Sequence, residues 1–353
     1  MFRASCRGIA GLAVLMAFGA VAPVHALTAG PNSPGASFNE VSFGTVPWTN
    51  PGNALASDNA YAQAAPGGGS TNYLEANNFG LSVPASAIID GIEVAIEKRS
   101  LAGTIFDSRV RIVKGGVIGA DEHADGATWP TTDTVVTYGG LGDLWGETWT
   151  AADVNAGSFG VVISATDSLD TAAIDHITMT VHFSLCPLTP FGGCRTSAKG
   201  LLLVKDNGDD TRDKIVWKLT NAATTSQTDF QDPTATTTYG LCLYQNGALT
   251  HGITIPPSGT LWSPISTVGF KYKDTALSAQ GVQRVILRGS DDNRTKIIVK
   301  GKGTGLPDPT PPLTEPVLVQ FVNSDTGLCW EGTYATPNIK RNEMGIFKSS
   351  FSN

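Results

Sequence analysis

Residues 91–98 read Gly-Ile-Glu-Val-Ala-Ile-Glu-Lys, and apolar and polar side chains alternate along them with a period of two. Successive side chains of an extended strand point to opposite faces, so Ile92, Val94 and Ile96 share one face. The stretch therefore predicts a half-buried β-strand. Similar strands are predicted at residues 108–113, 158–163 and 177–183.

The rest of the chain favours the same class of fold. Runs with a helical period are nearly absent, and the one short helix expected opens at Thr150-Ala151-Ala152-Asp153, which has the capping-box pattern. Many short strands separated by Gly and Pro are typical of sandwiches and barrels. We predict an all-β protein, with a jelly-roll-like sandwich over residues 27–185 and a second β-sandwich-like domain over residues 199–305.

The second unit contains an internal repeat. Residues 209–218 (DDTRDKIVWK) match residues 291–300 (DDNRTKIIVK), and each segment follows an apolar run. The Asp-Asp pair predicts a turn, and the Lys and Ile after it predict a strand with one side chain outward and the next inward. We expect two equivalent hairpins in one sandwich, with a duplicated ligand site as the alternative.

The remaining segments are connectors and ends. Residues 1–26 combine an arginine-bearing start, an apolar run and a small final residue, which predicts a cleaved signal peptide. Residues 186–198 are expected to be a linker, and the Pro-rich residues 306–316 an extended connector. Residues 317–353 are expected to form a hairpin and a tail packed on the second domain, with the last dozen residues frayed. No stretch after the leader is long and apolar enough for a transmembrane helix.

Charge is divided unevenly between the two units. The whole chain has a formal net charge of −7, and loss of the two arginines of the leader makes it −9. Residues 27–185 hold 5 basic and 17 acidic side chains, a balance of −12, whereas residues 199–305 hold 13 and 9, a balance of +4. An acidic surface suits calcium, and a basic one suits an anionic polysaccharide or the acidic domain itself. Plain solvation of both surfaces is the simpler interpretation.

Four cysteines follow the leader: Cys186, Cys194, Cys242 and Cys329. An even number in an exported chain predicts two disulfides, for which three connectivities exist. Because Cys186 and Cys194 enclose a short loop, we expect them to pair, which leaves Cys242 to pair with Cys329. A metal site is less favoured because no Cys-x-x-Cys spacing occurs.

Two groups of residues are candidates for ligand binding. Asp58 and Asn59 lie in a turn-rich acidic stretch and offer oxygen ligands for calcium, although both residue types are also ordinary in turns. Trp129, Trp145 and Trp149 crowd one region, where exposed rings would stack on sugars. Burial in the core is the commoner outcome for such residues. Trp129, which precedes Pro130, is the best candidate for an exposed platform.

Several motifs of the first unit resemble a sandwich module of exported bacterial and phage-associated proteins. They are residues 48–54 (WTNPGNA), 57–62 (SDNAYA), 89–94 (IDGIEV) and 143–150 (DLWGETWT). The resemblance covers most of residues 40–183 and implies the fold and an exported setting, without an activity. The second unit resembles modules of uncharacterised secreted bacterial proteins, which implies no mechanism.

Known catalytic signatures are missing from the sequence. There is no Gly-x-Ser-x-Gly elbow, His-Glu-x-x-His helix, phosphate loop or dinucleotide fingerprint. Asp175 and His176 are adjacent in an expected strand, so their side chains should point to opposite faces and form no dyad. Nucleic-acid binding is disfavoured because the basic unit is only modestly charged and export separates it from nucleic acid.

These observations favour a secreted, non-enzymatic protein of the extracellular space, periplasm or cell surface. It would serve attachment, matrix assembly or glycan binding, with a glycan or cell-surface polymer as partner and calcium as the one candidate cofactor. One alternative is a secreted polysaccharide hydrolase or lyase that uses paired carboxylates of the acidic domain. A phage- or secretion-related structural component is another, and an oligomer in solution would favour it.

Overall fold

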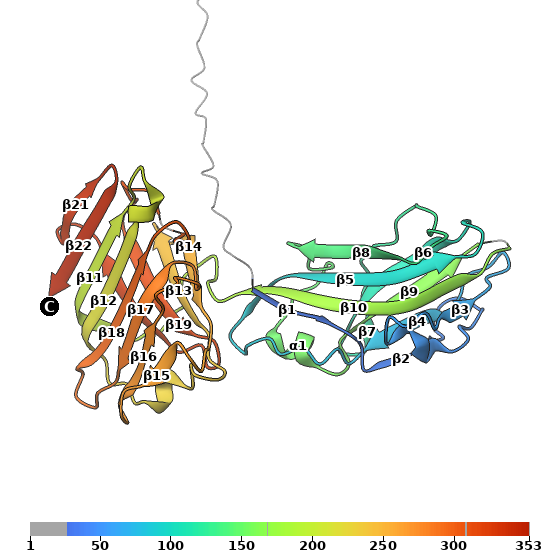
Figure 1. The fold of residues 1–353 in the computed structure, drawn as a ribbon, viewed down its shortest axis with the longest axis horizontal. Helices are drawn as coiled ribbons and strands as arrows, with labels where there is room; N and C mark the ends of the chain where they lie inside the picture. The colour runs from blue at the N-terminus through green and yellow to red at the C-terminus, as the bar shows by residue number, and fades with distance from the viewer. Residues whose placement is uncertain (1–26, 168, 308, 353) are drawn as a thin grey trace, which may run out of the picture.

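The computed structural model describes residues 27–353 except residues 168, 308 and 353. The signal peptide predicted at residues 1–26 lies outside the described residues. Two β-sandwiches follow one another along the chain, each around its own hydrophobic core (Figure 1). The prediction of an all-β, sandwich-like fold is confirmed. No helix among the described residues is long and apolar enough to cross a lipid bilayer.

The first sandwich is built from ten strands. They are β1 (Leu27–Asn32), β2 (Ala36–Glu40), β3 (Ala62–Ala64), β4 (Tyr73–Asn77), β5 (Ile88–Ser100), β6 (Phe106–Lys114), β7 (Val117–Ile118), β8 (Thr134–Leu141), β9 (Gly160–Thr166) and β10 (Ala172–Ser184). One antiparallel sheet has the order β1-β10-β5-β8, with β3 also paired to β10, and the other has the order β2-β4-β9-β6-β7. Ile92, Val94 and Ile96 of β5 are fully buried between the sheets, as their alternation predicts.

Among the described residues of the first sandwich, helical structure is confined to short turns. The 3₁₀ turn η1 (Pro51–Ala54) precedes β3, and the α-helix α1 (Ala151–Asn155) precedes β9. The α-helix begins as the sequence predicts: the Thr150 hydroxyl accepts a hydrogen bond from the Asp153 N–H, and the Asp153 carboxylate accepts one from the Thr150 N–H. This capping box is therefore confirmed.

The second sandwich has twelve strands and two 3₁₀ turns. They are β11 (Ser197–Lys205), η2 (Asp210–Arg212), β12 (Lys214–Ala222), η3 (Thr228–Phe230), β13 (Tyr239–Gln245), β14 (Ala248–Ile255), β15 (Trp262–Pro264), β16 (Gly269–Lys273), β17 (Val282–Arg288), β18 (Thr295–Lys302), β19 (Val317–Asn323), β20 (Cys329–Tyr334), β21 (Ile339–Glu343) and β22 (Ile346–Ser352). An eight-stranded sheet, β15-β16-β17-β18-β12-β11-β22-β21, packs on a four-stranded sheet, β14-β13-β19-β20.

The sequence repeat forms two hairpins, β11–β12 and β17–β18, which lie next to each other in the eight-stranded sheet. Their second strands pair with each other in antiparallel fashion, and Lys218 lies opposite Ile298. Ile215 and Ile297 point into the core while Lys214 and Lys296 are exposed. The prediction of two equivalent hairpins in one sandwich is confirmed.

The last residues of the chain are ordered, so the expectation that they fray is wrong. β22 pairs with β11 along Lys199–Lys205, and β21 then forms the outer edge of the eight-stranded sheet. Phe347 of β22 is fully buried in the core. Without β22, the hydrogen-bonding edge of β11 would be open, and the backbone bonds to β22 satisfy that edge.

The disulfides join Cys186 to Cys242 and Cys194 to Cys329, so the expected pairing is wrong. The reason is the path of the linker, which crosses the outer face of the four-stranded sheet. Cys186 is bonded to β13, and Cys194 is bonded to β20. Between them, the Gln320 side chain of β19 accepts a hydrogen bond from the Phe191 N–H (3.0 Å) and donates one to the Phe191 carbonyl (2.8 Å). Two disulfides are typical of proteins from oxidising compartments.

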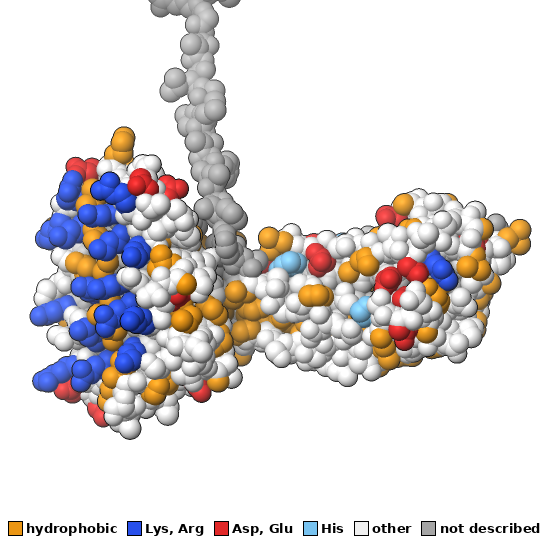
Figure 2. Space-filling view, viewed as in Figure 1, with side chains coloured by type: hydrophobic (Ala, Val, Ile, Leu, Met, Phe, Trp, Pro, Cys, Tyr) orange, Lys and Arg blue, Asp and Glu red, His pale blue; other side chains and the backbone are white. Residues whose placement is uncertain are grey.

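The linker therefore belongs to the second sandwich and leads from β10 onto its four-stranded sheet. A further contact between the two sandwiches is made by Ser86, whose hydroxyl donates a hydrogen bond to the Ser324 carbonyl (2.8 Å). Both contacts lie on the side of the four-stranded sheet. The outer face of the eight-stranded sheet is consequently turned away from the first sandwich (Figures 1 and 2).

Candidate functional site

The outer face of the eight-stranded sheet carries a dense array of cations, which we call the basic face (Figure 2). On β12 the side chains of Ile215, Trp217 and Leu219 are buried, so alternation directs Lys214 and Lys218 outward. The same parity on the neighbouring strands defines the basic face as thirteen side chains: Lys199, Lys205, Lys214, Lys218, Lys271, Lys273, Arg284, Arg288, Lys296, Lys300, Lys302, Arg341 and Lys348.

Strand register brings these cations directly opposite one another. Lys214 has Lys205 on one side and Lys302 on the other. In a second row, Arg284 lies between Lys273 and Lys300. Further opposed pairs are Arg288 with Lys296 and Arg341 with Lys348. Directly opposed like charges destabilise a sheet, by up to about 1 kcal/mol for each pair.

Few acids offset this charge. The strands of the eight-stranded sheet contain a single acid, Glu343, which pairs with Arg341. Among the described residues, Arg341 is also the one member of the basic face that lies within ion-pair distance of a carboxylate. Twelve cations of the face are thus without an acidic partner in the described part of the chain, and their charge is available to an external anion.

The centre of the basic face is apolar. Leu201 and Leu203 of β11, Val216 of β12 and Ile298 of β18 lie between the rows of cations. Val216 and Ile298 are buried although they point outward, as expected where long Lys stems cover neighbouring aliphatic groups. None of the large hydrophobic side chains that are exposed among the described residues belongs to the strands of this face. The surface offers cations around an aliphatic strip.

The structure places the three candidate Trp residues in or against the core of the first sandwich. Trp129 and Trp145 are 2% and 1% exposed, and Trp149 is partly buried. The indole N–H of Trp129 donates a hydrogen bond to Asp107 (2.7 Å), and that of Trp145 donates one to the Ile92 carbonyl (2.9 Å). The hypothesis that Trp129 is an exposed sugar platform is therefore wrong, because its ring and its N–H are both used inside the sandwich.

Asp58 and Asn59 form a turn above β10. The Asp58 carboxylate accepts a hydrogen bond from the Ala60 N–H (2.9 Å), and the buried Asp175 carboxylate accepts one from the Asn59 N–H (3.1 Å). In the described part of the chain, Asp58 belongs to no group of three His, Cys, Asp or Glu side chains that share a ligand-sized space. Calcium binding at Asp58 and Asn59 stays a prediction, and no cluster of further ligand side chains supports it.

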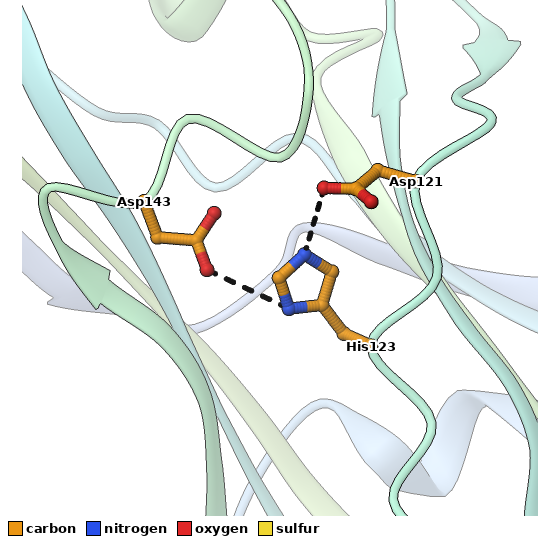
Figure 3. A group of neighbouring side chains, drawn as sticks. All are labelled: Asp121, His123 and Asp143. Atoms are coloured by element: carbon orange, nitrogen blue, oxygen red, sulfur yellow. Dashed lines mark hydrogen bonds and ion pairs between the residues drawn. The ribbon is translucent and has the colours of Figure 1, made fainter.

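A group that the sequence did not single out consists of Asp121, His123 and Asp143 (Figure 3). The His123 Nε2 lies 3.2 Å from Asp121 and its Nδ1 lies 3.6 Å from Asp143, while the imidazole stacks on Trp145 with ring centroids 3.8 Å apart. One ligand atom of each side chain lies within 4.8 Å of the others. Both ring nitrogens already face carboxylates, so the side chains of this surface group serve as partners for one another.

The second group that the sequence did not single out is buried between the sheets of the first sandwich. The Lys98 Nζ lies 2.7 Å from Asp107 Oδ1, and both side chains are almost completely enclosed. The Tyr138 hydroxyl donates a hydrogen bond to Asp107 Oδ2 (2.7 Å) and is also hydrogen-bonded to Lys98. Lys98 continues the face of Ile92, Val94 and Ile96, so the period of two already places it toward the core.

Burial perturbs the groups of this cluster in the expected directions. Loss of hydration lowers the pKa of Lys98, and the charge of Asp107 opposes that decrease. Loss of hydration also raises the pKa of Tyr138, with Asp107 adding to the increase, so the phenol stays protonated. The cluster thus holds a protonated phenol between an amine and a carboxyl group.

Neither His176 nor five pockets formed by the described residues bring together a pair of acid–base groups. Asp175 accepts from the backbone of Asp58 and Asn59, whereas the ring of His176 contacts the Ser33 hydroxyl (2.9 Å), so the two adjacent residues form no dyad. Five pockets formed by the described residues are lined by at most one carboxylate each. The paired carboxylates that glycoside cleavage requires are not brought together in any of these five.

Comparison with known proteins adds little. No protein-family model and no curated protein matches the chain. Among solved structures, a β-glucuronidase from Bacteroides uniformis is similar, with 10% sequence identity and a TM-score of 0.18. The match covers 81% of this chain and 27% of that enzyme, so the chain spans about a quarter of the enzyme's length. A TM-score this low carries no argument about fold or function.

Proposed function

We propose that this chain is an exported, non-enzymatic attachment or matrix protein that binds an anionic polysaccharide through the basic face. The observation that carries the proposal is the set of opposed cations without acidic partners. Such rows cost stability in the free protein, and a bound polyanion would offset that cost while releasing its own counterions.

The chemistry of the face favours a polysaccharide over two other polyanions. Proteins that read duplex DNA insert a helix or a two-stranded ribbon into a groove, whereas the basic face is the face of an eight-stranded sheet, which is too broad to enter one. The strands of the basic face expose no aromatic side chain among the described residues, so a membrane surface would be held by charge alone, without an aromatic anchor at the interface. Sugar rings carry both apolar CH faces and, in acidic polymers, carboxylate or sulfate groups, which match an aliphatic strip with cations around it.

The acidic first sandwich fits this arrangement. Its balance of −12 repels an anionic polymer, and the basic face points away from it. A bound polymer would therefore occupy one side of the molecule and leave the first sandwich displayed on the other. The rival hypothesis of a polysaccharide-cleaving enzyme has no comparable support, because the five pockets described above lack paired carboxylates.

The test is binding of the full chain to immobilised dextran sulfate, polygalacturonate and uncharged dextran, with duplex DNA and phosphatidylglycerol vesicles as competitors. We expect binding to the two acidic polysaccharides and none to uncharged dextran. The triple variant Lys214→Gln, Lys218→Gln, Lys300→Gln should lose at least about tenfold in affinity, equivalent to about 1.4 kcal/mol.

The matched control changes the net charge by the same three units on the first sandwich, with Thr131→Glu, Thr137→Glu and Thr148→Glu, which are exposed. Its affinity should stay close to that of the unmodified chain. Equal losses in both triple variants would show that net charge matters and the basic face does not. Stronger binding to DNA or to vesicles than to either acidic polysaccharide would reassign the partner.

A further inference from the structure

The buried cluster around Lys98 has the composition of a reactive site, and nothing in the proposed function uses it. Lys98 lies on β5 in one sheet, Asp107 lies on β6 in the other, and Tyr138 lies on β8 beside Lys98. We propose that Lys98 and Asp107 join in an intramolecular isopeptide bond, an amide between the lysine Nζ and the aspartate Cγ, which links the two sheets of the first sandwich covalently.

The geometry meets the first requirement, which is proximity. The Lys98 Nζ is 2.7 Å from Asp107 Oδ1, and an amine hydrogen-bonded to one carboxyl oxygen stands next to the carboxyl carbon. Held in this way, the two groups react as parts of one molecule, and such fixed arrangements correspond to very high effective concentrations. The side chain of Lys98 is 2% exposed and that of Asp107 is 0% exposed, so bulk water does not compete with the amine.

The second requirement is stabilisation of the charge that develops on the carboxyl group. The Trp129 indole N–H donates to Asp107 Oδ1 at 2.7 Å, which is where negative charge collects when the amine adds to Cγ. The Trp129 ring also lies 4.6 Å from the Lys98 Nζ and closes one side of the cluster. Trp129 thus serves as the oxyanion donor.

The third requirement is a path for protons. The Tyr138 hydroxyl is hydrogen-bonded both to Lys98 and to Asp107 Oδ2, so it bridges the nucleophile and the leaving oxygen. Burial lowers the pKa of Lys98 and raises that of Tyr138, which favours a neutral amine beside a protonated phenol. A phenol in this position passes a proton from nitrogen to oxygen without becoming charged for long.

The reaction balances without any other reagent. A proton passes from the Lys98 ammonium to the Asp107 carboxylate, which gives an amine and a carboxylic acid. The amine nitrogen bonds to Cγ, and the electron pair of the carbonyl moves onto Oδ1 beside Trp129. A proton then passes from the nitrogen through Tyr138 to Oδ2, the Cγ–Oδ2 bond breaks, one water leaves and the carbonyl re-forms.

Burial also sets the direction of the reaction. Two charges enclosed between sheets are costly, and removing them as a neutral amide relieves that cost. The product holds β5 and β6 together even if the hydrogen bonds of either sheet are disrupted. Because the two residues are nine positions apart, the bond closes a small loop and acts chiefly on the contact between the sheets.

The alternative is a permanent, unreacted ion pair, and tryptic peptide mapping of the folded full chain distinguishes the two. In an unlinked chain, trypsin cuts after Lys98, Arg99 and Arg109 and releases the free peptide of residues 100–109. In a linked chain, Lys98 resists cleavage, and residues 100–109 stay attached to the peptide that contains Lys98, with the mass of one water missing. We expect the linked form to account for nearly all of the folded protein.

Two variants make the result specific. Asp107→Asn should give a linked peptide of the same mass as the unmodified chain, because ammonia leaves in place of water. Tyr138→Phe keeps the ring and loses the proton path, so linked peptide should form at least about a hundredfold more slowly after refolding, which is the lower end of the range that general acid–base groups contribute. Full recovery of the free 100–109 peptide from protein with both native disulfides would overturn the proposal. Equal rates in Tyr138→Phe would remove Tyr138 from its catalytic role.

Discussion

Lys214 on β12 lies directly opposite Lys302 on β18, and no carboxylate lies within ion-pair distance of either side chain among the described residues. Lys205 completes the row on the other side of Lys214. A sheet selected for stability alone would place an acid at the middle of such a row. The arrangement is expected for a surface that binds a polyanion, because cations without acidic partners favour binding although they lower the stability of the free protein.

Because Lys214 lies between two other lysines, replacing it by an acid should raise the stability of the chain and lower its affinity for a polyanion. Lys214→Glu places an acid between Lys205 and Lys302 and should raise the free energy of unfolding by about 0.2–1 kcal/mol for each cross-strand pair at low salt. Affinity for dextran sulfate should fall at the same time. Urea unfolding and polymer binding of one preparation measure both quantities, and Lys214→Gln should lie between the two forms. A destabilised Lys214→Glu would contradict the repulsion described here.

The disulfides predict that the linker is held to the second sandwich at both ends. Replacing Cys194 and Cys329 together by Ala should lower the free energy of unfolding of the second sandwich by about 2–5 kcal/mol. The pair Cys186 and Cys242 closes a shorter loop, 56 residues against 135, and its loss should cost about 0.8 kcal/mol less in the chain-entropy model. Non-reducing peptide mapping checks the connectivity, and a Cys186–Cys194 peptide would contradict it.

Burial of His251 on β14 should make the stability of the chain depend on pH. Burial lowers the pKa of this imidazole from 6.5 to about 4, so the folded chain holds it neutral. The unfolded chain binds the proton near pH 6.5, and the stability from the neutral ring is therefore lost as pH falls from 6.5 to 4. The whole shift corresponds to about 3–4 kcal/mol, at about 1.4 kcal/mol for each pKa unit, and roughly 2–3 kcal/mol of it should be lost between pH 6.5 and 4.

The control for this pH dependence is His251→Leu, which removes the titrating group and keeps an apolar side chain. Its free energy of unfolding, measured in urea at several pH values, should vary less between pH 6.5 and 4 than that of the unmodified chain. The same slope in both proteins would show that other groups cause the dependence.

Substitution of Trp129 should lower the stability of the chain without lowering its affinity for the polymer. Trp129→Phe removes the N–H that Asp107 accepts and should lower the free energy of unfolding by about 1–3 kcal/mol. Affinity for dextran sulfate should be unchanged because the ring is buried in the first sandwich. A fall in affinity with unchanged stability would restore the hypothesis of a sugar platform.

Local patterns were sufficient for the parts of the fold that depend on neighbouring residues. The period of two in residues 91–98 places Ile92, Val94 and Ile96 in the core, and the repeated Asp-Asp turns give the two hairpins. Thr150 and Asp153 predict the start of α1 because a capping box is complete within four residues. The position of the linker could not be obtained in this way, since it depends on which sheet lies beneath Phe191.

The candidate sites depend on contacts between distant strands, and for that reason local patterns predicted only fragments of them. Lys214 and Lys296 were expected to point outward, but their rows form only through the register of eight strands. Lys98 could have been placed inward by its parity with Ile96, whereas its partner Asp107 comes from the opposite sheet. Trp129 precedes a proline and resembled a loop residue, yet its side chain enters the core.

The central claim is that the basic face binds an anionic polysaccharide, and lysine footprinting tests it most directly. The full chain is acetylated at limiting reagent with and without dextran sulfate, and the modification of each lysine is measured by mass spectrometry. We predict that Lys214, Lys218 and Lys300 become several-fold less reactive in the presence of the polymer while Lys114 of the first sandwich is unchanged. Unchanged reactivity at the three lysines of the basic face while the polymer is bound would contradict the account.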